Sequence, residues 1–323
     1  MKKTILGLAV FAVIALCAVC VLSLPATDSV THPALKNGLT FGSSKASQNA
    51  NVSFELQTSY PTVPKQVTIY QAESPVVSKD SIETLGKQVG VSGSLKESRN
   101  EYVLTDNDHI LEIHEKSGRI AYIDNVRWNQ ITGKDVPANL PPDSEATKIA
   151  TDYLEKSGLM SEDAVLSKVI HQQILALDSA GKTTSIPYEA IKVSYSRSID
   201  GLPVVGAGSK LSVEIGGGGD VIQMYKLWRT YVPQEKSVII TPEQAFDELK
   251  KQGVTGISTK DAVTAKVTKV YLAYYEDSAM EEQDQFLPVY VFEGNVAGME
   301  VSGEFTEYVP AIPGLAPAIP STK

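Results

Sequence analysis

Cysteine is almost missing from this sequence: there are two in 323 residues, Cys17 and Cys20, and both lie in an apolar stretch near the N-terminus. The rest of the chain has no disulfide, so its own hydrophobic core must hold it folded, which a chain of this length can do. The CxxC spacing would indicate redox or metal chemistry in a soluble domain. Within an apolar stretch we interpret both residues as small apolar side chains of a membrane segment.

The motifs of catalysis are absent as well. The sequence contains no HExxH pair for zinc and no GxSxG serine for a hydrolase. The glycine-rich stretches 201–208 and 216–219 match neither the dinucleotide-binding nor the phosphate-loop spacing. The four histidines share no motif: His32, His109, His114 and His171. We therefore expect a protein that is not an enzyme and that holds no cofactor or metal.

Positive charge is in the minority, with 29 Lys and Arg against 38 Asp and Glu and a net charge of -9. No basic stripe is present to neutralise phosphates, which excludes nucleic acid as a partner. Two acidic clusters could offer oxygen ligands to calcium, but neither has the alternating frame and distal glutamate of a calcium loop. We interpret them as solvated loops and leave calcium open: Asp106, Asn107 and Asp108, and Glu276, Asp277, Glu281, Glu282 and Asp284.

The N-terminus carries an export signal. Lys2 and Lys3 precede an apolar run over residues 5–24 that contains no charge, and a basic segment before an apolar core directs export. The run is long enough to span a bilayer, so residues 1–26 are either a cleaved signal peptide or a membrane anchor. In both cases the positive-inside rule predicts that the rest of the chain is extracytoplasmic, anchored or secreted. Residues 27–60, rich in Ser, Thr, Asn, Gly and Ala, predict a flexible tether.

The most patterned stretch is 188–233. Apolar residues alternate with polar ones over 191–196 and 211–215, and 221–231 is rich in β-branched and aromatic residues, which predicts three strands. Asp200-Gly201 is a pair typical of a tight turn, and Pro203 holds the entry to the next strand. We expect this turn to set the register of the sheet. Residues 241–252 predict a helix, because Thr241 caps it and Gln244 completes a capping box.

The pattern predicts an α+β fold of antiparallel sheets, each packed by one or two helices. A first small module is expected over 61–136 and a second, larger one over 143–309, with a linker at 137–142 and a disordered, proline-rich tail at 310–323. Residues 111–122 and 211–225 resemble each other as strand, glycine turn and strand. This weak repeat indicates either two copies of one module or a chance likeness between short strands.

Aromatic residues crowd the last predicted hairpin. One face of that hairpin must fill the core, and this is the preferred interpretation. The alternative is an exposed strip for a partner. The candidate partner-binding residues are Tyr274, Tyr290, Trp228 and Arg229.

Part of the chain resembles the PepSY modules of metalloprotease pro-regions and of free-standing envelope proteins. The matching segments are the strand Tyr195-Ser-Arg197, the turn Ile199-Asp-Gly201-Leu-Pro203, the strand 211–215, the turn 219–221 and the helix start 240–245. The likeness covers about a third of the chain. It implies a PepSY-like fold and a compartment outside the cytoplasm more than it implies a reaction. Taken with the weak repeat, it leads us to expect two related PepSY-like modules.

The resemblance implies a non-enzymatic binding or regulatory protein that restrains a protease or binds a peptide at the cell surface. The mechanism would be occlusion by a sheet surface or an edge strand, and the partner a protein or peptide of the cell envelope. The alternative is an accessory ectodomain of a membrane sensor, similar to the regulators of two-component kinases.

Overall fold

Strands dominate the structure, a computed structural model that describes residues 52–131, 139–172, 175–177, 183–185, 190–257, 261–298 and 302–313. Of these residues 49% lie in strands and 19% in helices. The helices are α2 (Lys79–Val89), α3 (Asn125–Ile131), α4 (Asp143–Lys156) and α5 (Pro242–Gln252). The strands are β1 (Val52–Leu56), β2 (Gln66–Ala72), β3 (Ser94–Ser98), β4 (Glu101–Thr105), β5 (His109–His114), β6 (Ile120–Asp124), β7 (Val165–Gln172), β8 (Leu175–Leu177), β9 (Thr183–Ser185), β10 (Ala190–Ser196), β11 (Ser198–Ile199), β12 (Leu202–Gly206), β13 (Lys210–Ile215), β14 (Val221–Leu227), β15 (Tyr231–Val238), β16 (Val263–Glu276), β17 (Gln285–Ala297) and β18 (Ser302–Pro310).

The expected α+β class is wrong. The described residues form two large sheets of eight strands each, a two-stranded sheet of β8 and β9, and only four α-helices, a mostly β architecture. One reason is that strands expected in separate modules pair with each other, since β6 joins β14 through Met224 and Tyr122. A second reason is length: β16 and β17 run for 14 and 13 residues, far longer than the helices that accompany them. Periodicity identifies strands but not the partner that each strand chooses.

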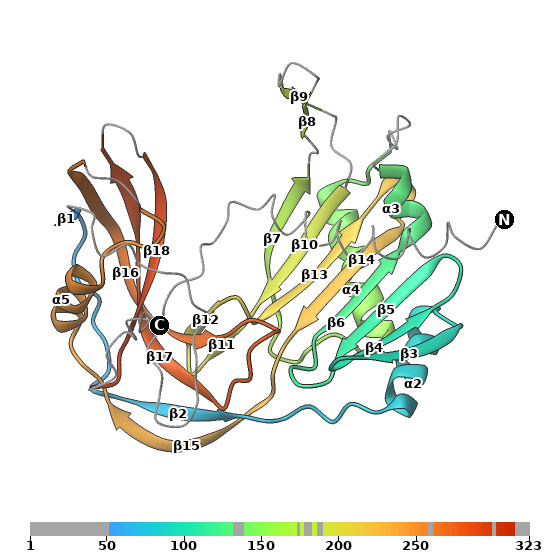
Figure 1. The fold of residues 1–323 in the computed structure, drawn as a ribbon, viewed down its shortest axis with the longest axis horizontal. Coiled ribbons are helices and arrows are strands. Elements are labelled where there is room, and N and C mark those ends of the chain that lie inside the picture. The colour runs from blue at the N-terminus through green and yellow to red at the C-terminus, as the bar shows by residue number, and fades with distance from the viewer. Residues whose placement is uncertain are drawn as a thin grey trace.

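Sheet I has the strand order β3-β4-β5-β6-β14-β13-β10-β7, with every neighbouring pair antiparallel. The two hairpins of the sequence repeat are β5–β6 and β13–β14, and the β6–β14 pair places them side by side (Figure 1). The expected boundary at 137–142 therefore falls between strands of a single hydrogen-bonded sheet.

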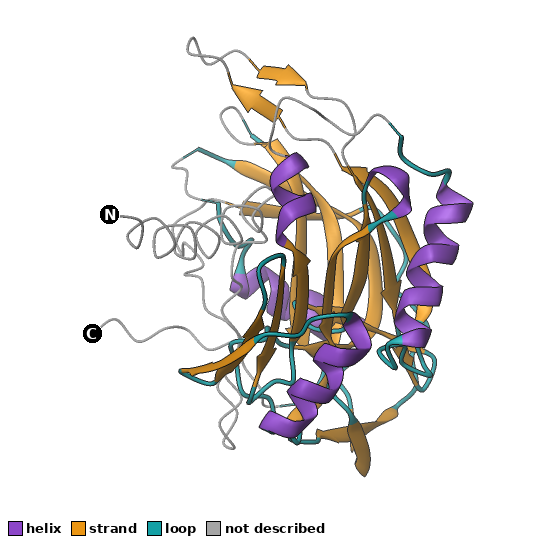
Figure 2. Ribbon diagram, turned by 90° about the vertical axis from the view of Figure 1, so that its right-hand side faces the viewer, coloured by secondary structure: helices purple, strands orange, loops and turns teal. Residues whose placement is uncertain are grey.

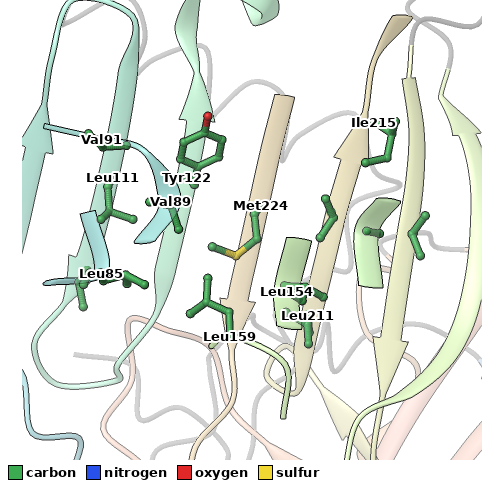
Figure 3. Close-up of a cluster of buried hydrophobic side chains, with 14 of the residues drawn as sticks. Leu85, Val89, Val91, Leu111, Tyr122, Leu154, Leu159, Leu211, Ile215 and Met224 are labelled. Atoms are coloured by element: carbon green, nitrogen blue, oxygen red, sulfur yellow. The ribbon is translucent and has the colours of Figure 1, made fainter. Parts of the chain in front are cut away.

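Helices lie over one face of sheet I (Figure 2). Ser78 caps the N-terminus of α2 and forms a capping box with Ser81. Gly90 caps its C-terminus in the left-handed conformation that glycine adopts at low cost. Apolar side chains of α2 and α4 meet the inward-facing residues of the strands in one core. Figure 3 shows part of this core: Leu85 and Val89 from α2, Leu154 from α4, and Leu111, Leu211 and Met224 from the sheet.

Sheet II has the order β11-β12-β16-β17-β2-β15, with β1 added to β16 and β18 to β17. The predicted helix at 241–252 is confirmed as α5, with the Thr241–Gln244 capping box in place. Phe246 and Leu249 of α5 pack on the core of this sheet. Strand β1 lies inside the stretch expected to be a tether, so the end of that stretch belongs to a sheet. Ala311, in the expected tail, is buried and its N–H donates to the Pro288 carbonyl.

The Asp200-Gly201 turn forms as expected, with φ of 51° and 78° between β11 and β12. Pro203 pairs with Ser198 across this short hairpin. The expected consequence for the register is wrong, however, because the hairpin belongs to sheet II and β12 runs parallel to β16. The chain leaves sheet I after Ser196 and returns to it at Lys210, so the register of β10 and β13 depends on packing of their buried residues.

The expected signal peptide or anchor at 1–26 lies outside the described residues. Within the part that is described, no helix has both the length and the apolar character needed to cross a membrane.

Candidate functional site

Three charged side chains are buried together where sheets I and II meet. Glu276 ends β16 and is fully buried, while Arg197 and Arg229 follow β10 and β14 and are 3% and 5% exposed. Glu276 Oε2 lies 2.7 Å from Arg197 Nη2, and Glu276 Oε1 lies 3.2 Å from Arg229 Nη1. The Ser209 hydroxyl contacts both Arg197 Nε and Glu276 Oε2. We call these four residues the junction cluster.

Hydrogen bonds and aromatic faces compensate the burial of these charges. Arg197 donates to the Arg229 carbonyl, and Arg229 donates to carbonyls of residues 277, 278 and 281. The Arg197 guanidinium also lies 4.9 Å from the Trp228 ring centroid and 5.2 Å from that of Phe286, distances typical of cation–π contacts. Removing one partner of such a network leaves an uncompensated buried charge, which costs roughly 3–5 kcal/mol.

The junction cluster extends to the segment that leads into β7. Trp228 Nε1 donates to Asp163 Oδ1 over 2.8 Å, and Asp163 Oδ2 lies 3.8 Å from Arg197 Nη1. Lys226 Nζ donates to the Leu159 carbonyl, and burial lowers the pKa of this lysine to about 8 although Asp163 opposes the shift. Asp163 stands two positions before β7, so these contacts hold the start of that strand in place.

Strand β7 is the last strand of sheet I, and among the described residues it pairs only with β10 (Figure 1). Three of its large apolar side chains are exposed: Val165 by 64%, Leu166 by 46% and Ile170 by 39%. At the far end of the strand, His171 Nε2 lies 2.6 Å from Asp143 Oδ1 at the start of α4. The strand is thus anchored at both ends, while its outer backbone edge has no strand partner among the described residues.

Most other edge strands of the two sheets carry features that oppose strand addition. Among the described residues β1 and β18 also pair with one strand each: β1 has only five residues, and β18 carries two glutamates and ends in a proline. β3 has five residues and carries Lys96 and Glu97, and β11 has only two residues. β15 contains Pro233, and its pairing with β2 shifts register after that residue. Short length, charge, proline and irregular pairing are the devices by which proteins keep sheet edges from pairing with other chains. β7 has eight residues and no proline, carries a single lysine, and shifts register against β10 once, between Ser194 and Tyr195.

Three of the four candidate partner-binding residues from the sequence are buried, and Trp228 is partly buried. Tyr274 and Tyr290 are fully buried, and their hydroxyls donate to the carbonyls of Thr68 and Ile240. Burial raises the pKa of Tyr290 to about 12. These two tyrosines fill the core, so the hypothesis of an exposed strip is wrong for them. Trp228 and Arg229 act instead through the contacts of the junction cluster.

The interpretation of residues 276–284 as a solvated loop is wrong for Glu276 and Asp277, which are both buried. Glu276 pairs there with Arg197 and Arg229. Glu282, by contrast, is exposed and pairs with Lys116. Among the described residues no group of three or more His, Cys, Asp or Glu side chains is placed to hold a metal ion. Glu276 shows no distinguishing signal in the sequence, because an acid at the end of a strand normally faces water.

A polar pocket of about 570 Å³ opens beside the loop that follows β16. Most of its charged groups already have partners: Lys116 pairs with Glu282, and Glu101 pairs with Arg119. His114 is buried and hydrogen-bonded to Ser117, and burial lowers the pKa of its imidazole.

Comparisons with known proteins add little to this geometry. No family model and no curated protein matches the chain. One similar solved structure is that of an uncharacterized protein from Eubacterium rectale. The alignment covers 82% of this chain and 90% of that one, with 13% sequence identity and a TM-score of 0.44. A likeness at this level carries no argument about function.

Proposed function

We propose that this chain is a non-enzymatic, extracytoplasmic binding or regulatory protein of the PepSY-like kind, which restrains a protease or holds a peptide at the cell surface. The observation that carries the proposal is the open edge of β7, with its exposed Val165, Leu166 and Ile170. The basic segment and apolar run at the N-terminus support a place outside the cytoplasm. The lack of catalytic motifs favours binding over chemistry.

The mechanism is the addition of a strand. An extended segment of the partner pairs with the free backbone groups of β7 and continues sheet I by one strand, while its side chains meet those of β7. The contacts of Asp163 and His171 order β7 before binding. A preordered edge lowers the entropy that binding must overcome, and this favours affinity.

Photocrosslinking in the cell envelope tests this function. A photoreactive amino acid replaces Ile170 in the full chain, and a matched control carries it at Val238, an exposed apolar position on the edge strand β15. We expect crosslinks from position 170 to an extracytoplasmic protease or peptide, and none from position 238. Equal capture at both positions, or none at 170, contradicts the proposal. Capture of a sensor kinase at 170 favours the accessory ectodomain instead.

A further inference from the structure

The two faces of β7 differ in character. Leu166 and Val169 lie opposite Tyr195 and Val193, two members of the core under the helices. Lys168 and Ile170 lie opposite Ser194 and Lys192, on the face turned away from the helices. A strand added to β7 therefore meets apolar side chains on the helix face, and a lysine and an isoleucine two residues apart on the other.

Lys168 is an exposed cation at the outer edge of this face. In the neighbouring strand, Lys192 Nζ lies 3.2 Å from Glu214 Oε1, and the same oxygen accepts a hydrogen bond from Gln172 Nε2. Glu214 is thus engaged and 5% exposed. Among the described residues no hydrogen bond or ion pair is formed by the side chain of Lys168, and it is exposed. Oppositely charged side chains across a strand pair stabilise it, and like charges destabilise it.

From these observations we infer that β7 selects an extended segment with an acidic side chain opposite Lys168 and an apolar side chain two residues away opposite Ile170. This inference rests on the proposed function. A separate anionic segment fits better than a second copy of the chain. Symmetric antiparallel pairing of two β7 strands with the two-fold axis at Lys168 would place two Lys168 side chains opposite each other with no acid between them.

Three labelled peptides test the inference against the purified full chain. The first is Thr-Val-Ile-Thr-Glu-Val-Ile-Thr, and the other two replace its glutamate by glutamine or lysine. Fluorescence anisotropy measures their affinities at low and high salt. We expect the glutamate peptide to bind about fivefold more tightly than the lysine peptide, the size of one cross-strand charge pair, with the difference shrinking in salt.

Charge reversal supplies the decisive control. Lys168→Glu is expected to invert the preference, so that the lysine peptide binds about fivefold more tightly than the glutamate peptide. Lys236→Glu, on the edge strand β15, is expected to leave the order unchanged. Equal affinities for all three peptides overturn the charge selectivity while strand addition stands. Absence of binding by any peptide also overturns it, and the Ile170 crosslinking then decides separately whether the proposed function fails too.

Discussion

Glu307 provides the sharpest prediction of pH-dependent stability. This residue of β18 is 1% exposed. Its carboxyl group accepts hydrogen bonds from the Thr255 backbone and hydroxyl and from Gln252 Nε2. These bonds favour the carboxylate, but the loss of hydration on burial is larger. Burial therefore raises the pKa of Glu307 from 4.5 to about 7.

The contribution of Glu307 to the unfolding free energy depends on pH, and its sign and size follow from the difference between the folded and unfolded pKa of this residue. Because the folded pKa is the higher one, the folded chain binds the proton more tightly, and this contribution to stability is fully present below pH 4.5. It is lost as pH rises from 4.5 to about 7. A difference of this size corresponds to about 3 kcal/mol of unfolding free energy.

Glu307→Gln removes the ionisation and keeps the shape. Gln252 Oε1 is buried without a hydrogen-bond partner, and the new amide can donate to it once the Gln252 side chain turns over. We expect the variant to match the wild type near pH 4.5 and to be more stable by roughly 1–3 kcal/mol at pH 8.

Urea unfolding of both proteins between pH 4 and 9 measures this effect. The difference between the two stability curves isolates Glu307 from other titrating groups. Glu304→Gln, at an exposed position of the same strand, serves as the control and is expected to shift stability by less than about 0.5 kcal/mol. Parallel curves for the wild type and Glu307→Gln would refute the reasoning.

Three further predictions concern the junction cluster and the turn. Glu276→Gln leaves two buried guanidinium groups uncompensated and should lower the unfolding free energy by roughly 3–5 kcal/mol, whereas the exposed Glu282→Gln should cost at most about 1 kcal/mol; similar losses from both contradict the role of the cluster. Gly206→Ala should cost at least about 3 kcal/mol, because its new Cβ would lie 2.4 Å from a backbone oxygen, and Gly201→Ala about 1 kcal/mol from backbone strain alone; thermal melts that rank them in reverse reject this account. Trp228→Phe removes the hydrogen bond before β7 and should cost about 1 kcal/mol. Backbone hydrogen exchange in the variant should then become faster over residues 163–170, while exchange in β4 stays unchanged as a control. If exchange in β7 does not change, the Trp228–Asp163 hydrogen bond does not anchor this strand.

The local features of this chain are determined by residues close together in the sequence. Thr241 and Gln244 are sufficient to predict the start of α5, and Asp200-Gly201 is sufficient to predict a turn with two positive φ angles. The alternation over 191–195 and 211–215 predicts β10 and β13 with their buried faces. In each case a cap, a backbone preference or a period of two acts within a few residues.

Pairing and burial across the chain were decided only by the tertiary structure. The sequence predicts β6 and β14 as strands but not that they join two expected modules into one sheet. The local sequence predicts that Glu276 is exposed to solvent. In the folded chain it is paired with Arg197 and Arg229, which follow strands of sheet I. The open edge of β7 is likewise a result of topology. Whether a strand of this composition is paired on one side or on both depends on which strands lie next to it. Strand pairing and burial depend on contacts between segments far apart in the sequence, and local residue patterns do not predict the energies of those contacts.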